Sequence, residues 1–313
     1  MAVECVEIRD AQTGSRARVL VGFGMNCFEF IVRDEAGEID LLWAEECFAD
    51  GDKRASSSGA PLLFPFPGRI PGTQLTWEGK SYELEAGDGR GNAIHGFVHN
   101  RPWRNIERAD NRVVGEFQAS VDAPDVLDRW PADFHLRVAY QLCGNRLSCH
   151  VEATNPDDHP LPCGFGSHPY FRLPLGGESA DDCRIQLPVR RQWELIEMLP
   201  TGRITDVPRA EELQAGLAFG QMQFDDVFTD LLAGDERVVA TIHDPSSKRG
   251  VSVSFSNSFR ECVVYNPPHR QAVCIEPYTC VPGAIALDDP TSKGLMILQP
   301  GETWRASIDI ALL

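Results

Sequence analysis

The feature that most constrains the fold is a two-residue alternation of apolar and polar side chains. The clearest run spans residues 134–142, where Phe, Leu, Val, Tyr and Leu alternate with polar or small residues. This period is typical of a strand with one buried face. A second alternating run, 147–151, follows a turn at Gly144-Asn145. The sequence therefore predicts a β-hairpin over residues 134–152.

The same alternation recurs at residues 251–255 and 304–312, and a second hairpin is predicted around the turn at 78–80. Helical signals are confined to short segments at 126–130 and 209–214. The 27 glycines and 22 prolines are spread along the chain between the short predicted strands, where they indicate turns. We therefore predict a mainly β fold, an antiparallel sandwich with few short helices.

Nothing in the chain marks an internal boundary, so we expect a single domain over residues 1–313. The segment 49–59 is polar and serine-rich, which predicts an exposed loop. The ten cysteines form no C-x-x-C pair and no Cys/His cluster with zinc spacing. We therefore interpret them as reduced thiols, mostly buried.

The charge balance argues against nucleic acid as a partner. Acidic residues number 46 against 29 basic ones, which gives a formal net charge of -17 that repels phosphate backbones. No apolar run approaches the roughly 20 residues of a membrane-spanning helix. Glu4 and Glu7 stand where a secretory signal would have a basic and then apolar run. We expect a cytoplasmic protein without a membrane partner.

Two histidines lie in settings suited to a sugar. His95 lies in the segment GNAIHGF and His168 in GFGSHPYF. Glycine allows a ligand to approach the backbone closely, and flat aromatic rings suit the faces of a sugar. The proline after His168 restricts the local backbone to an extended form. Each histidine by itself is more typical of a structural residue, but the pair in similar settings favours a site.

Three further segments carry charged candidates. Glu276 follows the strand-like residues 272–275, and a desolvated carboxylate there would suit a general base. Asp225 and Asp226 lie between aromatic residues, where they could bind hydroxyls or cap a turn. Arg69 stands in an apolar, proline-rich run and needs an anionic or hydroxyl partner if it is buried.

In this order the five segments resemble the aldose 1-epimerase (galactose mutarotase-like) family. The motifs are Pro-x-Gly-Arg-Ile around residue 69, Asn-x-x-His-Gly at 92–96, Ser-His-Pro-Tyr-Phe at 167–171, an Asp before an aromatic at 225, and Glu-Pro at 276. The resemblance implies an antiparallel β-supersandwich with a sugar-binding cleft. It also implies a cofactor-free isomerase that interconverts the α and β anomers of a free hexose by opening and closing the ring.

The resemblance further implies roles for single residues. Glu276 corresponds to the catalytic base and His168 to the catalytic acid, with no metal at the site. The residues expected to bind the substrate are His95, Arg69 and Asp225. The galactose enzymes usually carry Asp-His where this chain has Asp225-Asp226, so either aspartate could bind the sugar, and Asp225 is ranked first.

Three alternatives stay open at this point. A hexose 6-phosphate epimerase would need a cation for the phosphate, with candidates near the second motif: Arg90, Arg101 and Arg104. A sugar-binding protein without turnover would need no base or acid. A metal-dependent enzyme could use two histidines and a carboxylate as ligands: His95, His168 and Glu276. An exposed edge strand could also pair with a second copy, so a homodimer is a further alternative.

Overall fold

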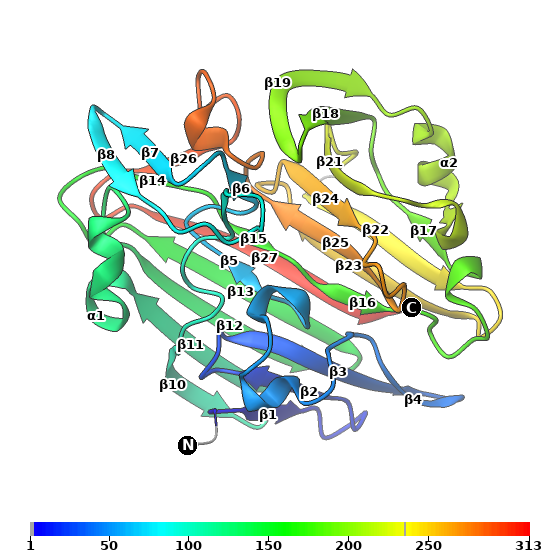
Figure 1. The fold of residues 1–313 in the computed structure, drawn as a ribbon. Coiled ribbons are helices and arrows are strands. Elements are labelled where there is room, and N and C mark those ends of the chain that lie inside the picture. The colour runs from blue at the N-terminus through cyan, green and yellow to red at the C-terminus, as the bar shows by residue number, and fades with distance from the viewer. Residues whose placement is uncertain (1–2, 235) are drawn as a thin grey trace.

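The computed structural model describes residues 3–234 and 236–313, and its strands pair antiparallel in stacked sheets (Figure 1). The largest sheet has nine strands in the order β10 (Arg104–Ala109), β11 (Arg112–Gln118), β12 (His135–Cys143), β13 (Arg146–Thr154), β27 (Thr303–Leu312), β23 (Arg249–Ser256), β22 (Arg237–Asp244), β17 (Arg184–Gln186) and β20 (Leu217–Ala218). The mainly β, antiparallel fold predicted from the sequence is confirmed.

A second sheet has eight strands. Its order is β19 (Leu199–Asp206), β18 (Arg191–Ile196), β21 (Asp225–Thr229), β24 (Glu261–Tyr265), β25 (Ala272–Tyr278), β15 (Gly166–Ser167) and β5 (Leu62–Leu63), and β16 (Tyr170–Arg172) also pairs with β25. Apolar side chains of both large sheets belong to one continuous core. Phe165, beside β15, packs against Trp304 of β27 with ring centroids 5.8 Å apart, which joins the two sheets.

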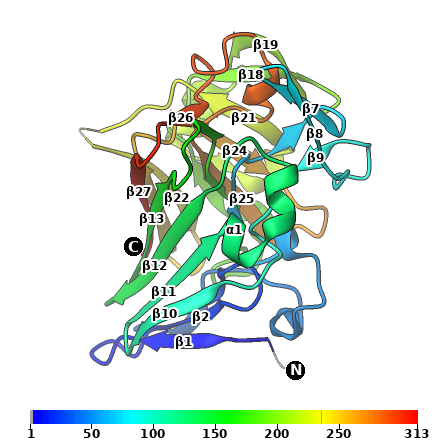
Figure 2. The same cartoon turned by 90° about the vertical axis from the view of Figure 1, so that its left-hand side faces the viewer.

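Smaller sheets surround these two layers. One has four strands: β1 (Val6–Arg9), β2 (Arg16–Leu20), β3 (Asn26–Asp34) and β4 (Gly37–Asp40). The two-stranded sheets are β14 (Leu161–Cys163) with β26 (Met296–Leu298), β6 (Arg69–Ile70) with β9 (Ala93–Ile94), and β7 (Gln74–Trp77) with β8 (Lys80–Glu83). Figure 2, turned by 90°, shows β1 and β2 at the foot of the molecule and the β7–β8 hairpin near its top.

Both predicted hairpins form. In the β12–β13 hairpin Cys143 lies opposite Arg146, so the turn is Gly144-Asn145 as expected. In the β7–β8 hairpin Trp77 lies opposite Lys80 across a two-residue turn. The predicted strands at 251–255 and 304–312 are parts of β23 and β27.

The helices are short, and one of them was not predicted. Helix α2 (Ala210–Ala215) matches the signal at 209–214, whereas the turn expected at 126–130 is a 3-10 helix at Pro124–Asp128 that follows α1 (Ala119–Asp122). Asp122 accepts a hydrogen bond from the backbone N–H of Gln118, and this local bond has no periodic sequence signal. The other 3-10 turns are Phe48–Asp50, Ala55–Ser57, Ala180–Asp182, Phe219–Gln221 and Ala284–Ala286. No helix in the described part of the chain is long and apolar enough to cross a bilayer.

The prediction of an exposed loop over residues 49–59 is wrong for its second half. Ala55, Ser56 and Ser58 are buried. Asn26, a fully buried side chain on β3, donates to the Ser58 carbonyl and accepts from the Ala60 N–H, each at 2.9 Å. In this segment the polar residues therefore belong to a buried loop whose backbone groups form hydrogen bonds inside the protein.

A glycine contact fixes the loop that carries His95. His95 and Gly96 both have positive φ angles, 68° and 71°. A Cβ added at Gly96 would lie 2.0 Å from the carbonyl oxygen of Phe64. The loop therefore depends on glycine both for its left-handed backbone and for this close approach.

We expect Gly96→Ala to lower the free energy of unfolding by clearly more than the roughly 1–2 kcal/mol that a left-handed alanine costs, because the Phe64 backbone must also move. Gly14→Ala is the matched control, since Gly14 has a φ of +75° but open space around it. Urea unfolding of both variants measures the difference. Equal losses would contradict the close-approach argument.

Candidate active site

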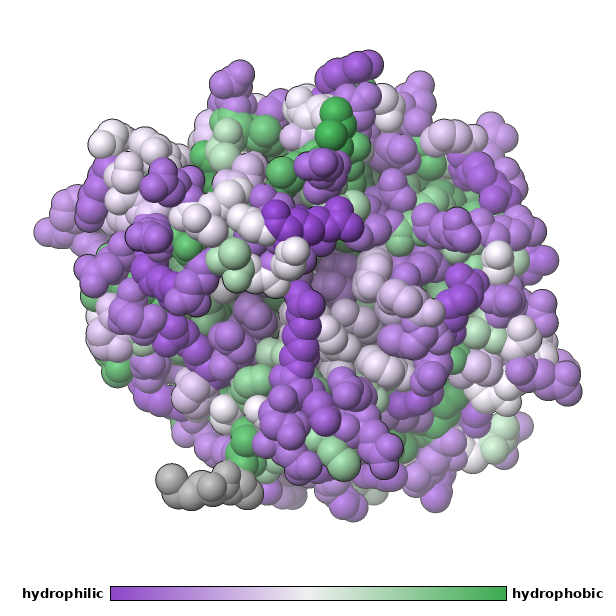
Figure 3. Space-filling view, in the orientation of Figure 1, coloured by the Kyte–Doolittle hydropathy of each residue, from purple (hydrophilic) through white to green (hydrophobic). Residues whose placement is uncertain are grey.

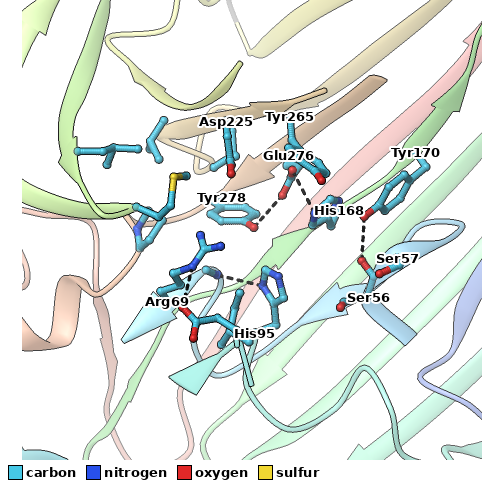
Figure 4. Close-up of a pocket in the computed structure, with 18 of the residues that line it drawn as sticks. Ser56, Ser57, Arg69, His95, His168, Tyr170, Asp225, Tyr265, Glu276 and Tyr278 are labelled. Carbon is cyan, nitrogen blue, oxygen red and sulfur yellow. Dashed lines mark hydrogen bonds and ion pairs between the residues drawn. The ribbon is translucent and has the colours of Figure 1, made fainter. Parts of the chain in front are cut away.

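A pocket of about 210 Å³ opens on the outer face of the eight-stranded sheet. The space-filling view shows the hollow near the centre of this face, edged mainly by hydrophilic residues (Figure 3). All five residues selected from the sequence line it: Arg69, His95, His168, Asp225 and Glu276. These residues come from distant parts of the chain, and the sheet and its loops bring them together (Figure 4).

Strand β25 supplies Glu276 by simple alternation. Val273 and Ile275 point into the main core, whereas Ala272 and Cys274 belong to a separate small cluster on the other face. Glu276 follows the second set, because side chains two residues apart share a face of a strand. The carboxylate is held on a fully buried strand and is 1% exposed.

Glu276 and His168 form a close pair at the floor of the pocket. Glu276 Oε1 lies 3.3 Å from His168 Nε2, and the Tyr278 hydroxyl donates a hydrogen bond of 2.8 Å to Glu276 Oε2 (Figure 4). Burial raises the pKa of Glu276 well above its usual value and lowers the pKa of His168 to about 3. Both shifts disfavour the charged forms, so the pair at rest is neutral and holds one exchangeable proton.

The orientation of His95 fixes which of its nitrogens carries a proton. The backbone N–H of Gly68 donates to His95 Nδ1 at 3.3 Å. Burial, with the nearby His168 as a further cause, keeps the pKa of His95 well below its usual value, so the ring is neutral. A neutral imidazole that accepts at Nδ1 carries its proton at Nε2. His95 is therefore a hydrogen-bond donor without charge.

Arg69 is held by an aspartate that the sequence analysis did not select. Its Nε donates to Asp88 Oδ2 at 3.2 Å, and the Asp88 side chain is fully buried. Asn92 donates to both oxygens of Asp88, through its backbone N–H and its side-chain amide. Although burial opposes it, these hydrogen bonds and that of Arg69 lower the pKa of Asp88 to about 2. Arg69 is thus paired with a carboxylate and fixed in direction.

The two adjacent aspartates lie on different faces of β21. Asp225 and Val227 line the pocket, and Asp226, between them, does not. Burial raises the pKa of Asp225, and Arg69 acts in the opposite direction. The geometry therefore places Asp225, the residue ranked first, on the pocket wall and not Asp226.

Aromatic and hydroxyl groups that the sequence analysis missed complete the pocket. Tyr170 stacks on His168 with ring centroids 4.8 Å apart and planes 6° apart, and its hydroxyl donates to the Ser56 carbonyl at 3.1 Å. Tyr265 meets the His168 ring edge-on at 6.2 Å. Tyr278 stands two residues from Glu276 on β25, so strand alternation could have found it, whereas His168 lies between β15 and β16 and gives no such signal for Tyr170.

The arginines proposed for a phosphate lie elsewhere. Arg101 forms an ion pair with Asp125, and Arg104 with Asp122. Neither they nor the exposed Arg90 line the pocket. Arg54 does line it, and donates to the Gly87 carbonyl at 3.3 Å.

Two groups in the described part of the chain bring metal-ligating atoms together. One is His168, Cys274 and Glu276, whose ligand atoms lie within 4.8 Å of one another; His168 and Glu276 line the pocket, and Cys274 is buried beside them. The other is a surface group, Asp157, Asp158 and His159. His95, named with His168 and Glu276 in the metal alternative, is in neither group.

Comparison with known proteins agrees with this geometry. The family model for aldose 1-epimerase matches residues 20–311. The protein LacX (plasmid) of Lactococcus lactis is 23% identical over 295 residues, which cover 90% of this chain and 92% of LacX. The uncharacterized protein YphB of Escherichia coli K12 is 28% identical over 187 residues, 54% of this chain and 58% of YphB.

Solved structures share the whole fold. A galactose mutarotase-like protein from Clostridium acetobutylicum superimposes with a TM-score of 0.86 at 22% identity, covering 100% of this chain and 99% of that one. The GalM/aldose epimerase homologue from C. elegans gives a TM-score of 0.81 at 19% identity, covering 99% and 98%. At these identities the structures establish the fold, and the family model extends over nearly the full length. The chain belongs to the aldose 1-epimerase family.

Proposed function

We propose that this protein is an aldose 1-epimerase that interconverts the α and β anomers of a free hexose without a cofactor. The observation that carries the proposal is the Glu276–His168 pair, a carboxylate and an imidazole 3.3 Å apart at the floor of a sugar-sized pocket. A base and an acid in this arrangement are what ring opening of a hemiacetal requires.

In the proposed reaction Glu276 takes the proton of the C1 hydroxyl while His168 gives a proton to the ring oxygen. The C1–O5 bond breaks, and the electrons of the O1–H bond form the carbonyl of the open-chain aldehyde. Rotation about C1–C2 presents the other carbonyl face, and the same transfers run in reverse. Protons and electrons balance, since the pair ends each cycle as it began.

The neutral resting state fits this chemistry. Transfer of the shared proton from Glu276 to His168 gives the reactive form, in which Glu276 is the base and His168 the acid, and the hydrogen bond from Tyr278 stabilises the carboxylate of that form. Proton transfer between Glu276 and His168 leaves the net charge of the pair unchanged. A buried pair that stays neutral overall avoids the desolvation cost of an isolated ion.

The remaining groups would bind and orient the sugar. His95, a neutral donor at Nε2, suits the ring oxygen or the oxygen on C1 as charge develops there. Arg69 and Asp225 offer complementary donors and acceptors for sugar hydroxyls. The Tyr170 and Tyr265 rings add flat surfaces beside the acid.

Polarimetry of freshly dissolved α-D-glucose and α-D-galactose, with and without protein, tests the proposal. Faster mutarotation of a free sugar supports it. Sugar binding without acceleration would instead favour a non-catalytic binding protein on this fold.

A hexose 6-phosphate is the second candidate substrate, because Arg54 places a guanidinium on the pocket wall. Anomer exchange on glucose 6-phosphate, followed by NMR, separates the two. Acceleration confined to the phosphate would transfer the assignment to that class.

We expect Glu276→Gln to lower the mutarotation rate by about 10²–10⁴-fold, because the amide keeps the size of the side chain but cannot take a proton. His168→Asn should have a similar effect for the acid. Initial polarimetric rates at matched protein concentration measure both losses. Melting temperatures close to wild type would show that the fold is retained, and near wild-type rates in both variants would refute the assignment.

The two aspartates provide a matched comparison. Asp225→Asn should raise KM for the sugar, because it removes a charged acceptor that faces the pocket. Asp226→Asn changes the neighbouring residue, which does not line the pocket, and should leave KM unchanged. If Asp226→Asn raises KM and Asp225→Asn does not, the placement of these side chains is wrong.

A further inference from the structure

Cys274 is a third reactive group beside the catalytic pair, and the proposed reaction does not use it. It precedes Glu276 by two residues on β25 and shares its face of the strand. It is fully buried, in a small cluster with Tyr170 and Tyr265. Its sulfur, one imidazole nitrogen of His168 and one carboxylate oxygen of Glu276 lie within 4.8 Å of one another.

The spacing of these atoms is close to that of a tetrahedral metal site. Zinc bonds of about 2.0–2.2 Å to nitrogen and oxygen place two such ligands roughly 3.3–3.5 Å apart. The observed distance from His168 Nε2 to Glu276 Oε1 is 3.3 Å. With a zinc–sulfur bond of about 2.3 Å, the thiolate would stand roughly 3.6 Å from each, so from the observed limit of 4.8 Å the Cys274 sulfur needs to approach by at most about 1.2 Å.

A second observation concerns the carboxylate oxygen of Glu276 that faces His168. Glu276 Oε1 is buried and has no hydrogen-bond partner among the residues described, since its contact with His168 does not meet hydrogen-bond geometry. A buried acceptor without a partner is unfavourable and uncommon. This oxygen is the carboxylate atom nearest the imidazole nitrogen, whereas Oε2 is already bonded to Tyr278.

The charges also fit a divalent ion. One carboxylate, one thiolate and one neutral imidazole balance a charge of two, so the occupied site is neutral and suits a buried position. Binding would release the thiol proton and the proton held by the pair. His168 and Glu276 line the pocket, so water in the pocket would be available as a fourth ligand.

We propose that His168, Cys274 and Glu276 form a binding site for a thiophilic divalent cation of the zinc class. The bound ion occupies both the base and the acid, and therefore inhibits the epimerase. The inhibition rests on the proposed function, whereas the binding does not. The ligand set differs from the metal alternative considered from the sequence, because Cys274 takes the place of His95 and the ion blocks turnover.

Cobalt(II), a spectroscopic substitute for zinc, tests the binding directly. Titration of purified reduced protein with Co²⁺ should give a thiolate-to-cobalt charge-transfer band with intense visible bands of a tetrahedral site, and Zn²⁺ should displace them. Cys274→Ser should abolish the charge-transfer band. It should also weaken Zn²⁺ binding by at least the roughly 10–100-fold that loss of a supporting group costs a metal site.

Cys143→Ser is the matched control, because Cys143 is exposed on the β12–β13 hairpin, and its spectrum should equal that of wild type. The surface group Asp157, Asp158 and His159 contains no sulfur, so binding there cannot produce the band. If Cys274→Ser does not fold, His168→Asn removes the nitrogen ligand and should also lose the tetrahedral spectrum. A wild-type protein without the thiolate band, or a band that survives Cys274→Ser, would overturn the proposal.

Zn²⁺ should also slow mutarotation by the wild-type protein, while Cys274→Ser keeps its activity and resists Zn²⁺. Metal binding without any mutarotase activity would refute the proposed function and leave the metal site standing. Mutarotase activity that Zn²⁺ does not inhibit, in a protein that gives no cobalt spectrum, would support the proposed function and refute the metal site.

Discussion

The burial of Glu276 is the constraint on which the rest of the site depends. An ionised carboxylate that is 1% exposed would cost several kcal/mol if nothing compensated it. Tyr278 donates to one oxygen and His168 lies beside the other, so the pair can share a proton and stay neutral. The same arrangement that makes the carboxylate tolerable in the protein interior also places the base and the acid of the proposed reaction side by side.

Polar side chains hold the pocket walls in place around this pair. Asn26 ties the 55–60 segment to β3 through two backbone hydrogen bonds, and Asp88 joins Arg69 to Asn92. These bonds satisfy backbone and charged groups that would otherwise be buried without partners. The pocket walls are loops, and hydrogen bonds from a few buried carboxylate and amide side chains hold these loops in position.

Much of the fold could be read from alternation, because a strand with one buried face repeats every two residues. The β12–β13 hairpin and the strands β23 and β27 were predicted in this way. The α1 helix and the buried serines of the 49–59 segment were not, because each depends on a hydrogen bond to a particular side chain, Asp122 in one case and Asn26 in the other. Polarity in a sequence does not distinguish a solvated loop from one bonded internally.

The same reasoning explains what could be said of the site. The five motif residues were singled out from their local settings and given roles through the resemblance, and the structure brings them to one pocket. The choice between Asp225 and Asp226 needed the structure, because adjacent residues on a strand face opposite ways and the sequence does not say which face is open. Asp88 carries no motif, since its role is to hold Arg69 and is visible only once the two are in contact.

Alternation also makes the neighbours of the proposed catalytic base part of its chemistry. Residues two apart on a strand share a face and lie roughly 6–7 Å apart along it, so Cys274 and Tyr278 flank Glu276 whatever their chemical character. Tyr278 is a donor that favours the carboxylate form, and Cys274 is a soft ligand that favours a metal. A carboxylate on a strand is thus held rigidly, and the residues two positions before and after it are always its neighbours on the same face. Because Cys274 occupies one of these positions, Glu276 and His168 become part of a candidate metal-ligand set while their own geometry is unchanged.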